Sequence, residues 1–475
     1  MKKILTNYLY NATYQLLLIA LPFLTTPYLS RILGPSQLGR YGVVLSVSQF
    51  MVVIITMGLG QLGVRTIAEK KAVDRDKHFW SLFSIQFSSG IIVSLVYMLF
   101  TWTIFKESSL LYVAQFPFVL AYIFDISWLF QGLELFKKVV IRNSTIKLIS
   151  VGLIFIFVKH KEDLLLYILI NSLSFMASNT VFWLGIKNYI GKFNFDKELF
   201  LQYLPQSFYL LVPQILTQII ITLDKPILYF FSDSTQVAFY DQSQKLARII
   251  LSVITTLNIV MLPGLSKLAS QNDKFGIKKK IDQSFQFSYT LGAFFSVTMC
   301  NFSDVFVPWF FDSKFTPMIV NLKIVSFLIL VIPVGLVFSN QYALAIKNDK
   351  AYLYPLVLGA LTSLCIYPVL MGSLRSLGGS FAILIVETII CFSRMIYVGE
   401  DFHYQRLFRE NKNTTIIFFS LLAIGTLINI GSSIFSLTLS QHWMSLILLH
   451  IIGFILIARK FLKIYFLKKK ELKNE

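Results

Sequence analysis

Three charged residues, Asp241, Lys245 and Arg248, are spaced so that they share one face of a helix. The positions i, i+4 and i+7 place them along a stripe about 10 Å long. Lys245 and Arg248 would offer two cations to an anion such as a diphosphate, and the guanidinium can bind two oxygens at once. Asp241 would hold Lys245 when no ligand is bound. In the alternative, the Asp241 and Lys245 pair only anchors the outer end of the helix.

Three more ionisable residues stand inside or at the end of apolar segments. Asp224 and Lys225 come just before a proline, and as sequence neighbours they point about 100° apart, so we do not expect them to line one face together. Either one of them faces a binding cavity, or both cap the outer end of the segment. Glu387 has no basic residue one turn away, so it is a candidate to carry a coupling proton or to pair with Arg248 on another helix.

A polar stripe follows Asp125, because Trp128, Gln131 and Glu134 come at i+3, i+6 and i+9. Such a stripe would bind sugar hydroxyls through the carboxylate of Asp125 and stack a sugar ring on Trp128. The alternative is an interfacial helix end with an aromatic belt.

Two arginines stand at the ends of the first two apolar segments. We expect Arg31 at the outer mouth of a pathway and Arg65 at the inner mouth, where either would guide a phosphate. Ordinary placement of basic residues on the cytoplasmic side explains Arg65 equally well.

The elements that must position these residues are membrane helices. Of the 475 residues, 56% are hydrophobic and 14% charged, and the mean hydropathy is +0.68, which is more apolar surface than a soluble domain of this size can bury. The apolar stretches are about 20 residues long and lack the period of a strand, so we predict an all-α polytopic membrane protein. We place fourteen spans near residues 8–33, 40–63, 79–105, 110–132, 143–158, 163–186, 206–230, 236–263, 285–311, 318–341, 351–373, 377–398, 414–437 and 443–466.

The basic residues lie mostly in short loops on one side of these spans. This asymmetry explains the net charge of +19 without a nucleic acid, and it places both termini in the cytoplasm. The three cysteines fall inside apolar spans without ligand spacing, so no disulfide, metal or cofactor is expected. No Walker A motif is present and no loop is long enough for a catalytic domain, which argues against an enzyme.

An internal repeat relates the two halves of the chain. Residues 25–41 and 224–240 align with four identities in seventeen positions, and both segments join one apolar span to the next. Because the repeats begin six spans apart, the halves run in the same direction, as in transporters that rock two bundles about a central site. We therefore predict an N-terminal six-helix lobe (1–200), a second six-helix lobe (201–400) around a central cavity, and a two-helix appendage with a basic cytoplasmic tail (401–475).

Three segments carry a family resemblance: YNATYQLLLIALPFLTTPYLSRILGPSQLGRYG (10–42), GLGQLGVRTIA (58–68) and LDKPILYFFSDSTQVAFYDQSQKLARI (223–249). The chain resembles the polysaccharide-transporter flippases, the Wzx-type members of the superfamily that also holds multidrug exporters and lipid II flippases. The third segment departs from the family pattern, since Ala238 and Phe239 stand where a glycine usually precedes the tyrosine.

The resemblance implies flipping of an undecaprenyl-pyrophosphate-linked repeat unit of capsule, O-antigen or teichoic acid, with two extra helices lining a groove for the lipid tail. We expect membrane lipids as further partners and energy from an ion gradient, with H⁺ or Na⁺ as candidate coupling ions, or from the substrate itself. We expect a monomer that works beside glycan-assembly enzymes in the cytoplasmic membrane. The alternatives are a multidrug or cation exporter of the same superfamily, whose cavity would be acidic or apolar, and a membrane-embedded polysaccharide polymerase.

Overall fold

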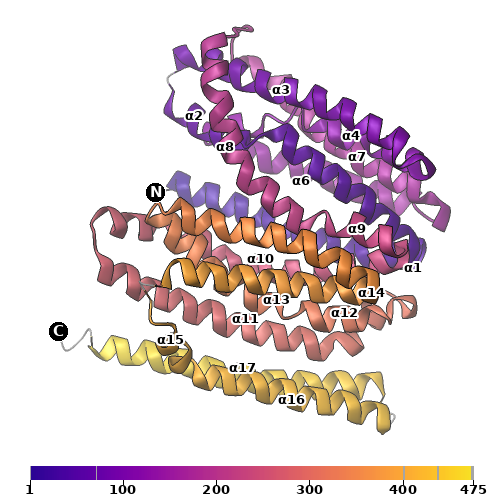
Figure 1. The fold of residues 1–475 in the computed structure, drawn as a ribbon, viewed down its shortest axis with the longest axis vertical. Coiled ribbons are helices and arrows are strands. Elements are labelled where there is room, and N and C mark those ends of the chain that lie inside the picture. Colours follow the sequence, from indigo (N-terminus) through magenta and orange to yellow (C-terminus); the bar gives the residue numbers. More distant parts are fainter. Residues whose placement is uncertain (1, 71, 400–401, 436–437, 472–475) are drawn as a thin grey trace. The chain divides into compact units, whose positions relative to one another are not determined.

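The computed structural model describes residues 2–70, 72–399, 402–435 and 438–471, and over these residues the chain is helical and has no strand (Figure 1). In this part of the chain, ten helices are long and apolar enough to cross a membrane, or eleven if the bent pair 234–256 and 261–270 counts as one span. The predicted all-α polytopic fold is confirmed. The last residues of the predicted basic tail, 472–475, lie outside the described residues.

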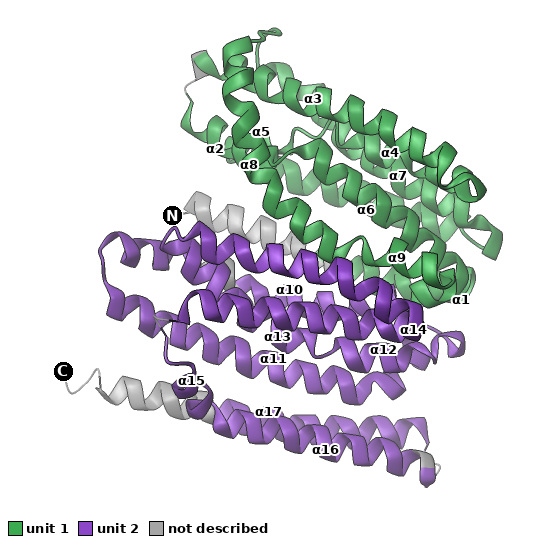
Figure 2. Ribbon diagram, in the orientation of Figure 1, with its two compact units in different colours: residues 1–238 green, residues 239–475 purple. Residues whose placement is uncertain are grey.

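The chain divides by its internal contacts into two units, residues 1–238 and 239–475 (Figure 2). The boundaries predicted at residues 200 and 400 stay a prediction. Unit 1 is built from α1 (Lys2–Thr56), α2 (Leu59–Glu69), α3 (Ala72–Thr103), α4 (Ser109–Ala121), α5 (Ser127–Gly132), α6 (Phe136–Phe157), α7 (Leu164–Thr180), α8 (Lys197–Ile221), α9 (Asp224–Phe231) and the first residues of α10 (Ser234–Ser270).

Unit 2 holds most of α10 and the helices after it. These are α11 (Lys274–Phe310), α12 (Met318–Val325), α13 (Leu328–Leu336), α14 (Asp349–Tyr397), α15 (Tyr404–Glu410), α16 (Lys412–Ile434) and α17 (Leu439–Glu471). A π-helical turn, η5 (Val337–Ala343), continues α13. The two last long helices, α16 and α17, pack against each other and against α11.

Two long helical stretches are broken inside, which accounts for two of the predicted spans that are not counted as separate helices. In α1, Gly34 has a φ of 72° and is followed by a proline, whose fixed φ suits the start of a new helix. In α14, Arg375 has a φ of 53°, and Gly378 packs directly on the carbonyl of Leu370, so the chain turns back there. Each stretch is about 50 residues long, enough for two crossings of a hydrocarbon core of about 30 Å.

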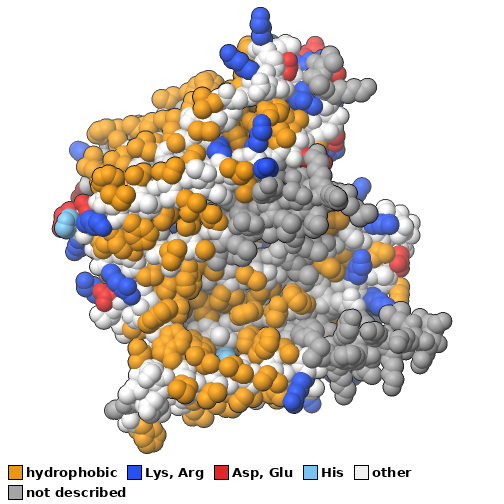
Figure 3. All heavy atoms as spheres, turned by 180° about the vertical axis from the view of Figure 1, so that it is seen from behind, with side chains coloured by type: hydrophobic (Ala, Val, Ile, Leu, Met, Phe, Trp, Pro, Cys, Tyr) orange, Lys and Arg blue, Asp and Glu red, His pale blue; other side chains and the backbone are white. Residues whose placement is uncertain are grey.

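Apolar side chains cover much of the outside of the helices as well as filling their cores. Figure 3 shows one face on which hydrophobic side chains cover the middle of the helices, while charged side chains gather toward their ends. Leu95, Leu99 and Leu427, for example, each expose more than 60% of their surface. This is the surface expected of a protein whose solvent is lipid.

Candidate functional site

The charged face predicted on α10 forms in unit 2. Asp233 caps the helix by accepting from the backbone N–H groups of Thr235 and Gln236 at 2.7 and 3.1 Å. Further along α10, in unit 2, Lys245 Nζ lies 2.6 Å from Asp241 Oδ2, so the predicted i, i+4 pair is present. The carboxylate is buried, whereas the Lys245 side chain is 42% exposed and keeps its ammonium near open space.

Two further polar groups lie on this face. Arg248 is half-buried and makes no hydrogen bond or ion pair with any described residue. Gln244 precedes it by one turn and is 3% exposed, and neither atom of its amide has a partner within the described chain. Sequence reasoning missed Gln244, although its i+3 spacing from Asp241 was the available signal. The face therefore presents two cations and an unsatisfied amide.

Glu387 lies on α14, which contacts α10 through a glycine. Gly379 packs against the ring of Tyr240, where a Cβ would come within 3.1 Å, and this contact joins α14 to α10. The cations whose charge acts on Glu387 are Arg394 and, more weakly, Arg248. No ion pair within 4.0 Å forms between Glu387 and Arg248 in the described chain, so a role for Glu387 in pairing or in carrying a proton stays a prediction.

Arg394 is a buried cation that the sequence analysis did not single out. Its side chain is 6% exposed, and its Nε has no hydrogen-bond partner among the described residues. A Cβ at Gly335, just before η5, would lie 3.3 Å from a terminal nitrogen of the guanidinium, so the arginine packs closely on this glycine. The spacing of i+7 from Glu387 on α14 was the signal that could have identified it.

In unit 1, Asp224 and Lys225 at the start of α9 form an ion pair that the sequence analysis did not consider, and whether either residue faces a cavity stays a prediction. Lys225 Nζ lies 3.3 Å from Asp224 Oδ1 and 3.2 Å from the carbonyl oxygen of Ile221. The Asp224 side chain is 1% exposed and that of Lys225 13%. The helical angle separates their Cβ atoms, but the four methylenes of the lysine bend back far enough to join the charges.

The predicted stripe from Asp125 to Glu134 is broken, because the expected span 110–132 is two short helices. Asp125 lies between α4 and α5 and accepts from the backbone N–H of Ser127 at 2.9 Å. Gln86 on α3 donates to the carbonyl oxygens of Tyr122 and Asp125 at 2.7 and 2.9 Å. These bonds satisfy backbone groups that the break would otherwise leave unpaired.

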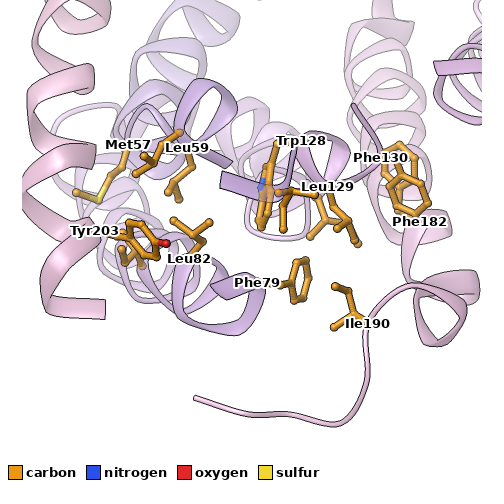
Figure 4. Close-up of a cluster of buried hydrophobic side chains, with 14 of the residues drawn as sticks. Met57, Leu59, Phe79, Leu82, Trp128, Leu129, Phe130, Phe182, Ile190 and Tyr203 are labelled. Carbon is orange, nitrogen blue, oxygen red and sulfur yellow. The ribbon is translucent and has the colours of Figure 1, made fainter. Parts of the chain in front are cut away.

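Trp128 is a core side chain and not an open surface for stacking a sugar. It is 3% exposed, its indole N–H donates to Gln86 Oε1 at 3.2 Å, and its ring packs on Gly63, where a Cβ would overlap it. Figure 4 shows the ring among apolar neighbours that include Phe79 and Leu129. The alternative stated for this stripe, a structural helix end, fits the packing better.

The two arginines in the other family-like segments are exposed. Arg31 lies on α1, three residues before the break at Gly34. Arg65 lies on α2 and its Nε is 3.1 Å from Glu69 Oε1, with the arginine side chain 78% exposed. An ion pair this exposed contributes little to stability. The exposed positions of Arg31 and Arg65 are compatible with a role at a mouth of a pathway, and that role stays a prediction.

Comparison with known proteins places this geometry in a family. The family model described as polysaccharide biosynthesis protein matches residues 4–269. A putative O-antigen transporter of Escherichia coli (strain K12) is 23% identical over 402 residues, which cover 83% of this chain and 96% of that protein.

Solved structures share the fold. The lipid II flippase MurJ, in an inward closed conformation, superposes with a TM-score of 0.75 at 14% identity over 96% of this chain and 100% of that one. An inward-facing multidrug resistance MATE transporter superposes with a TM-score of 0.65 at 11% identity over 84% of this chain and 96% of that one. The predicted resemblance to the Wzx-type transporters is thus confirmed, and the chain belongs to the polysaccharide biosynthesis protein family.

Proposed function

We propose that this protein flips an undecaprenyl-pyrophosphate-linked oligosaccharide, a repeat unit of capsule, O-antigen or teichoic acid, from the cytoplasmic to the outer leaflet by alternating access. The observation that carries the proposal is the α10 face, on which Lys245 and Arg248 place two cations within an apolar helix bundle. We further propose that the protein lies in the bacterial cytoplasmic membrane with both termini in the cytoplasm.

The energetics of the face favour an anionic ligand. An arginine at membrane depth costs about 2.5–3.5 kcal/mol on insertion scales, so such residues usually have a partner or a function. Arg248 has no carboxylate within ion-pair distance in the described chain, and the nearby amide of Gln244 is unsatisfied. A diphosphate would supply acceptor oxygens to both and to Lys245, and charge-assisted bonds of this kind are the strong ones.

The relatives support transport and not catalysis, since they are an O-antigen transporter, a lipid II flippase and a multidrug transporter. The second candidate function is drug or cation export, which the likeness to the multidrug transporter favours. A cation exporter needs an acidic or apolar binding face, whereas the α10 face carries two cations for one carboxylate.

The test is depletion of the protein, followed by measurement of lipid-linked repeat units in the cytoplasmic leaflet. Accumulation that wild type relieves, and that Arg248→Gln relieves at least tenfold less well, is the expected result. The control is Arg406→Gln, because Arg406 lies on α15 in an exposed pair with Glu410 at 2.6 Å and should rescue like wild type. If no lipid-linked intermediate accumulates, drug or cation export becomes the better-supported function. Full rescue by Arg248→Gln would show that the Arg248 cation is not needed, which would contradict the role proposed for the α10 face.

A further inference from the structure

Lys147 is a lysine near the middle of a membrane helix of unit 1. It stands about 15 Å from either end of α6 (Phe136–Phe157), too deep for its side chain to reach the membrane surface by extending along the helix. It makes no hydrogen bond or ion pair with any described residue. An ionisable residue at this depth is costly to insert and usually faces a partner, water or a substrate.

The lysine stands on the face of α6 that packs inside unit 1. Val140, Val151 and Ile154, which share this face at −7, +4 and +7, are 8%, 9% and 3% exposed. The exposed apolar residues of α6 lie on the opposite side of the helix: Ile141, Leu148, Ile149 and Ile156. Lys147 is nevertheless only half-buried, so the packing of this face is incomplete around its side chain.

An aromatic ring beside the lysine is open in the same way. Lys147 Nζ lies 5.7 Å from the centre of the Phe175 ring on α7, which is within cation–π range. Ser172 and Asn179, at −3 and +4 on the same face of α7, are 0% and 7% exposed, whereas Phe175 is 37% exposed. The ring is held edge-on by Phe118 of α4, with 4.9 Å between the ring centres. A fixed aromatic surface and a cation therefore lie partly open side by side.

Polar groups flank the lysine on its own helix. Asn143 and Ser150 lie one turn before and one turn after it, on the same face. Asn143 Oδ1 accepts from Ser178 Oγ at 3.1 Å, and the Asn143 amide N–H groups have no acceptor among the described residues. Ser150 is 1% exposed and its Oγ has no partner in the described chain. Because α6 contains no carboxylate, this face suits a ligand that is rich in acceptor oxygens.

We infer that the α6–α7 face, made of Asn143, Lys147 and Ser150 on α6 and Phe175 on α7, binds an acidic sugar of the transported glycan. The C–H face of the sugar ring stacks on Phe175, which supplies the aromatic surface that the buried Trp128 does not. A carboxylate or phosphate group on the sugar takes a charge-assisted bond from the Lys147 ammonium. The inference rests on the proposed function and narrows its substrate class to anionic glycans.

Other anions fit this face less well. A diphosphate alone has no apolar surface to set against Phe175. The headgroup of a bilayer lipid lies at the membrane surface, about 15 Å along the helix from Lys147. A sugar acid is the ligand that uses both the ring and the cation.

The experiment measures the affinity of the full-length protein in nanodiscs for three polyprenyl diphosphate disaccharides. They differ only in the terminal sugar, which is glucose, glucuronic acid or a glucose phosphate. We expect wild type to bind at least one acidic compound at least tenfold more tightly than the glucose compound. The acidic compound that binds more tightly identifies the acidic group, carboxylate or phosphate, that the site prefers.

Lys147→Gln should reduce this preference to less than twofold and leave the affinity for the glucose compound unchanged. Lys147→Arg keeps the charge and should keep the preference. The matched control is Lys187→Gln, which removes the same charge from an exposed lysine of unit 1 in η3 (Val181–Asn188) and should also keep the preference.

Phe175→Leu tests the aromatic surface separately. It should weaken binding of all three compounds at least threefold, because leucine preserves apolar volume but offers no ring for stacking. Binding of the same polyprenyl diphosphate without a sugar should not change. An unchanged affinity for all three sugars would contradict the stacking role.

Two results would overturn the inference as a whole. One is a wild-type protein that binds all three disaccharides equally well, and the other is a folded Lys147→Gln variant that keeps the full preference for an acidic sugar. If Lys147→Gln does not fold, the wild-type preference and the Phe175→Leu variant decide the question. Absence of binding of every polyprenyl diphosphate compound by wild type would instead count against the proposed function, so the two failures are distinguishable.

Discussion

Gly39 packs directly on the backbone of Ser234, so that a Cβ on the glycine would overlap the serine carbonyl oxygen. Three residues before the glycine, Ser36 Oγ lies 3.0 Å from Ser234 Oγ. The two segments are those that align as an internal repeat, 25–41 and 224–240. The start of the second half of α1 therefore lies against the start of α10 within unit 1.

The closeness of these backbones predicts that Gly39→Ala destabilises unit 1. The added methyl has to push the α10 backbone away, and overpacking of this kind costs about 1–3 kcal/mol. Thermal unfolding in detergent should show a lower midpoint for this variant. Gly152→Ala is the matched control, because Gly152 lies in α6 with nothing within 4 Å of its Cβ position. That change should be neutral or raise the midpoint, since alanine favours a helix.

The ion pair on α10 predicts the effect of neutralising its carboxylate. Asp241→Asn releases Lys245, whose ammonium is 42% exposed and can then turn to a ligand. The buried carboxylate holds the ammonium more firmly than an exposed partner would, so binding of a diphosphate lipid should strengthen by at least about twofold when that carboxylate is neutralised. Isothermal titration in nanodiscs measures the change. Weaker binding would mean that Asp241 itself contacts the ligand or orders the helix.

The break between α4 and α5 predicts a structural role for Gln86. Its amide donates to carbonyl oxygens of Tyr122 and Asp125 in the linker between these helices and accepts from the indole of Trp128. Gln86→Leu would leave these buried groups unsatisfied at about 1–3 kcal/mol each. We expect a fall of several kcal/mol in unfolding free energy, measured by thermal or denaturant unfolding. The exposed Gln202→Leu on α8 is the control and should cost little.

Spacing along a single helix could be read from the sequence, and this is why the Asp241 and Lys245 pair was predicted correctly. Hydropathy likewise predicted the membrane helices, since length and apolar composition are local properties. What joins separate helices could not be read in this way. The dependence of Trp128 on Gln86 links residues 42 positions apart, and nothing in the periodicity of either segment reveals it.

Two other differences have local causes that helical spacing alone does not contain. Lys225 reaches Asp224 because its side chain is flexible, whereas the helical wheel describes only the direction of Cβ. Arg394 lies near the end of a predicted span, where arginines commonly face the interface, and only its 6% exposure shows that it is inside the bundle. Exposure is a tertiary property, so the candidate site could be predicted only in part.

A polar chain of side chains holds α16 and α17 on α11 in unit 2. Asn301 Nδ2 donates to the carbonyl oxygen of Leu421 at 3.0 Å, and Asn429 Nδ2 donates to the carbonyl oxygen of Asn301 at 3.0 Å. His442 Nε2 on α17 lies 2.7 Å from Asn429 Oδ1. Asn429 is therefore the link between all three helices.

This position predicts that Asn429→Leu loosens the last two long helices without unfolding the rest. Polar contacts between membrane helices contribute about 0.6–2 kcal/mol each, and the variant loses those made by the Asn429 amide to Asn301 and His442. Hydrogen–deuterium exchange should rise at least threefold in residues 412–459 and stay unchanged in unit 1. Thr426→Val is the control, because its hydroxyl bonds only to Ala423 within α16. Unchanged exchange in Asn429→Leu would mean that apolar packing alone, such as that of Phe418 and Leu421 against α11, holds these helices in place.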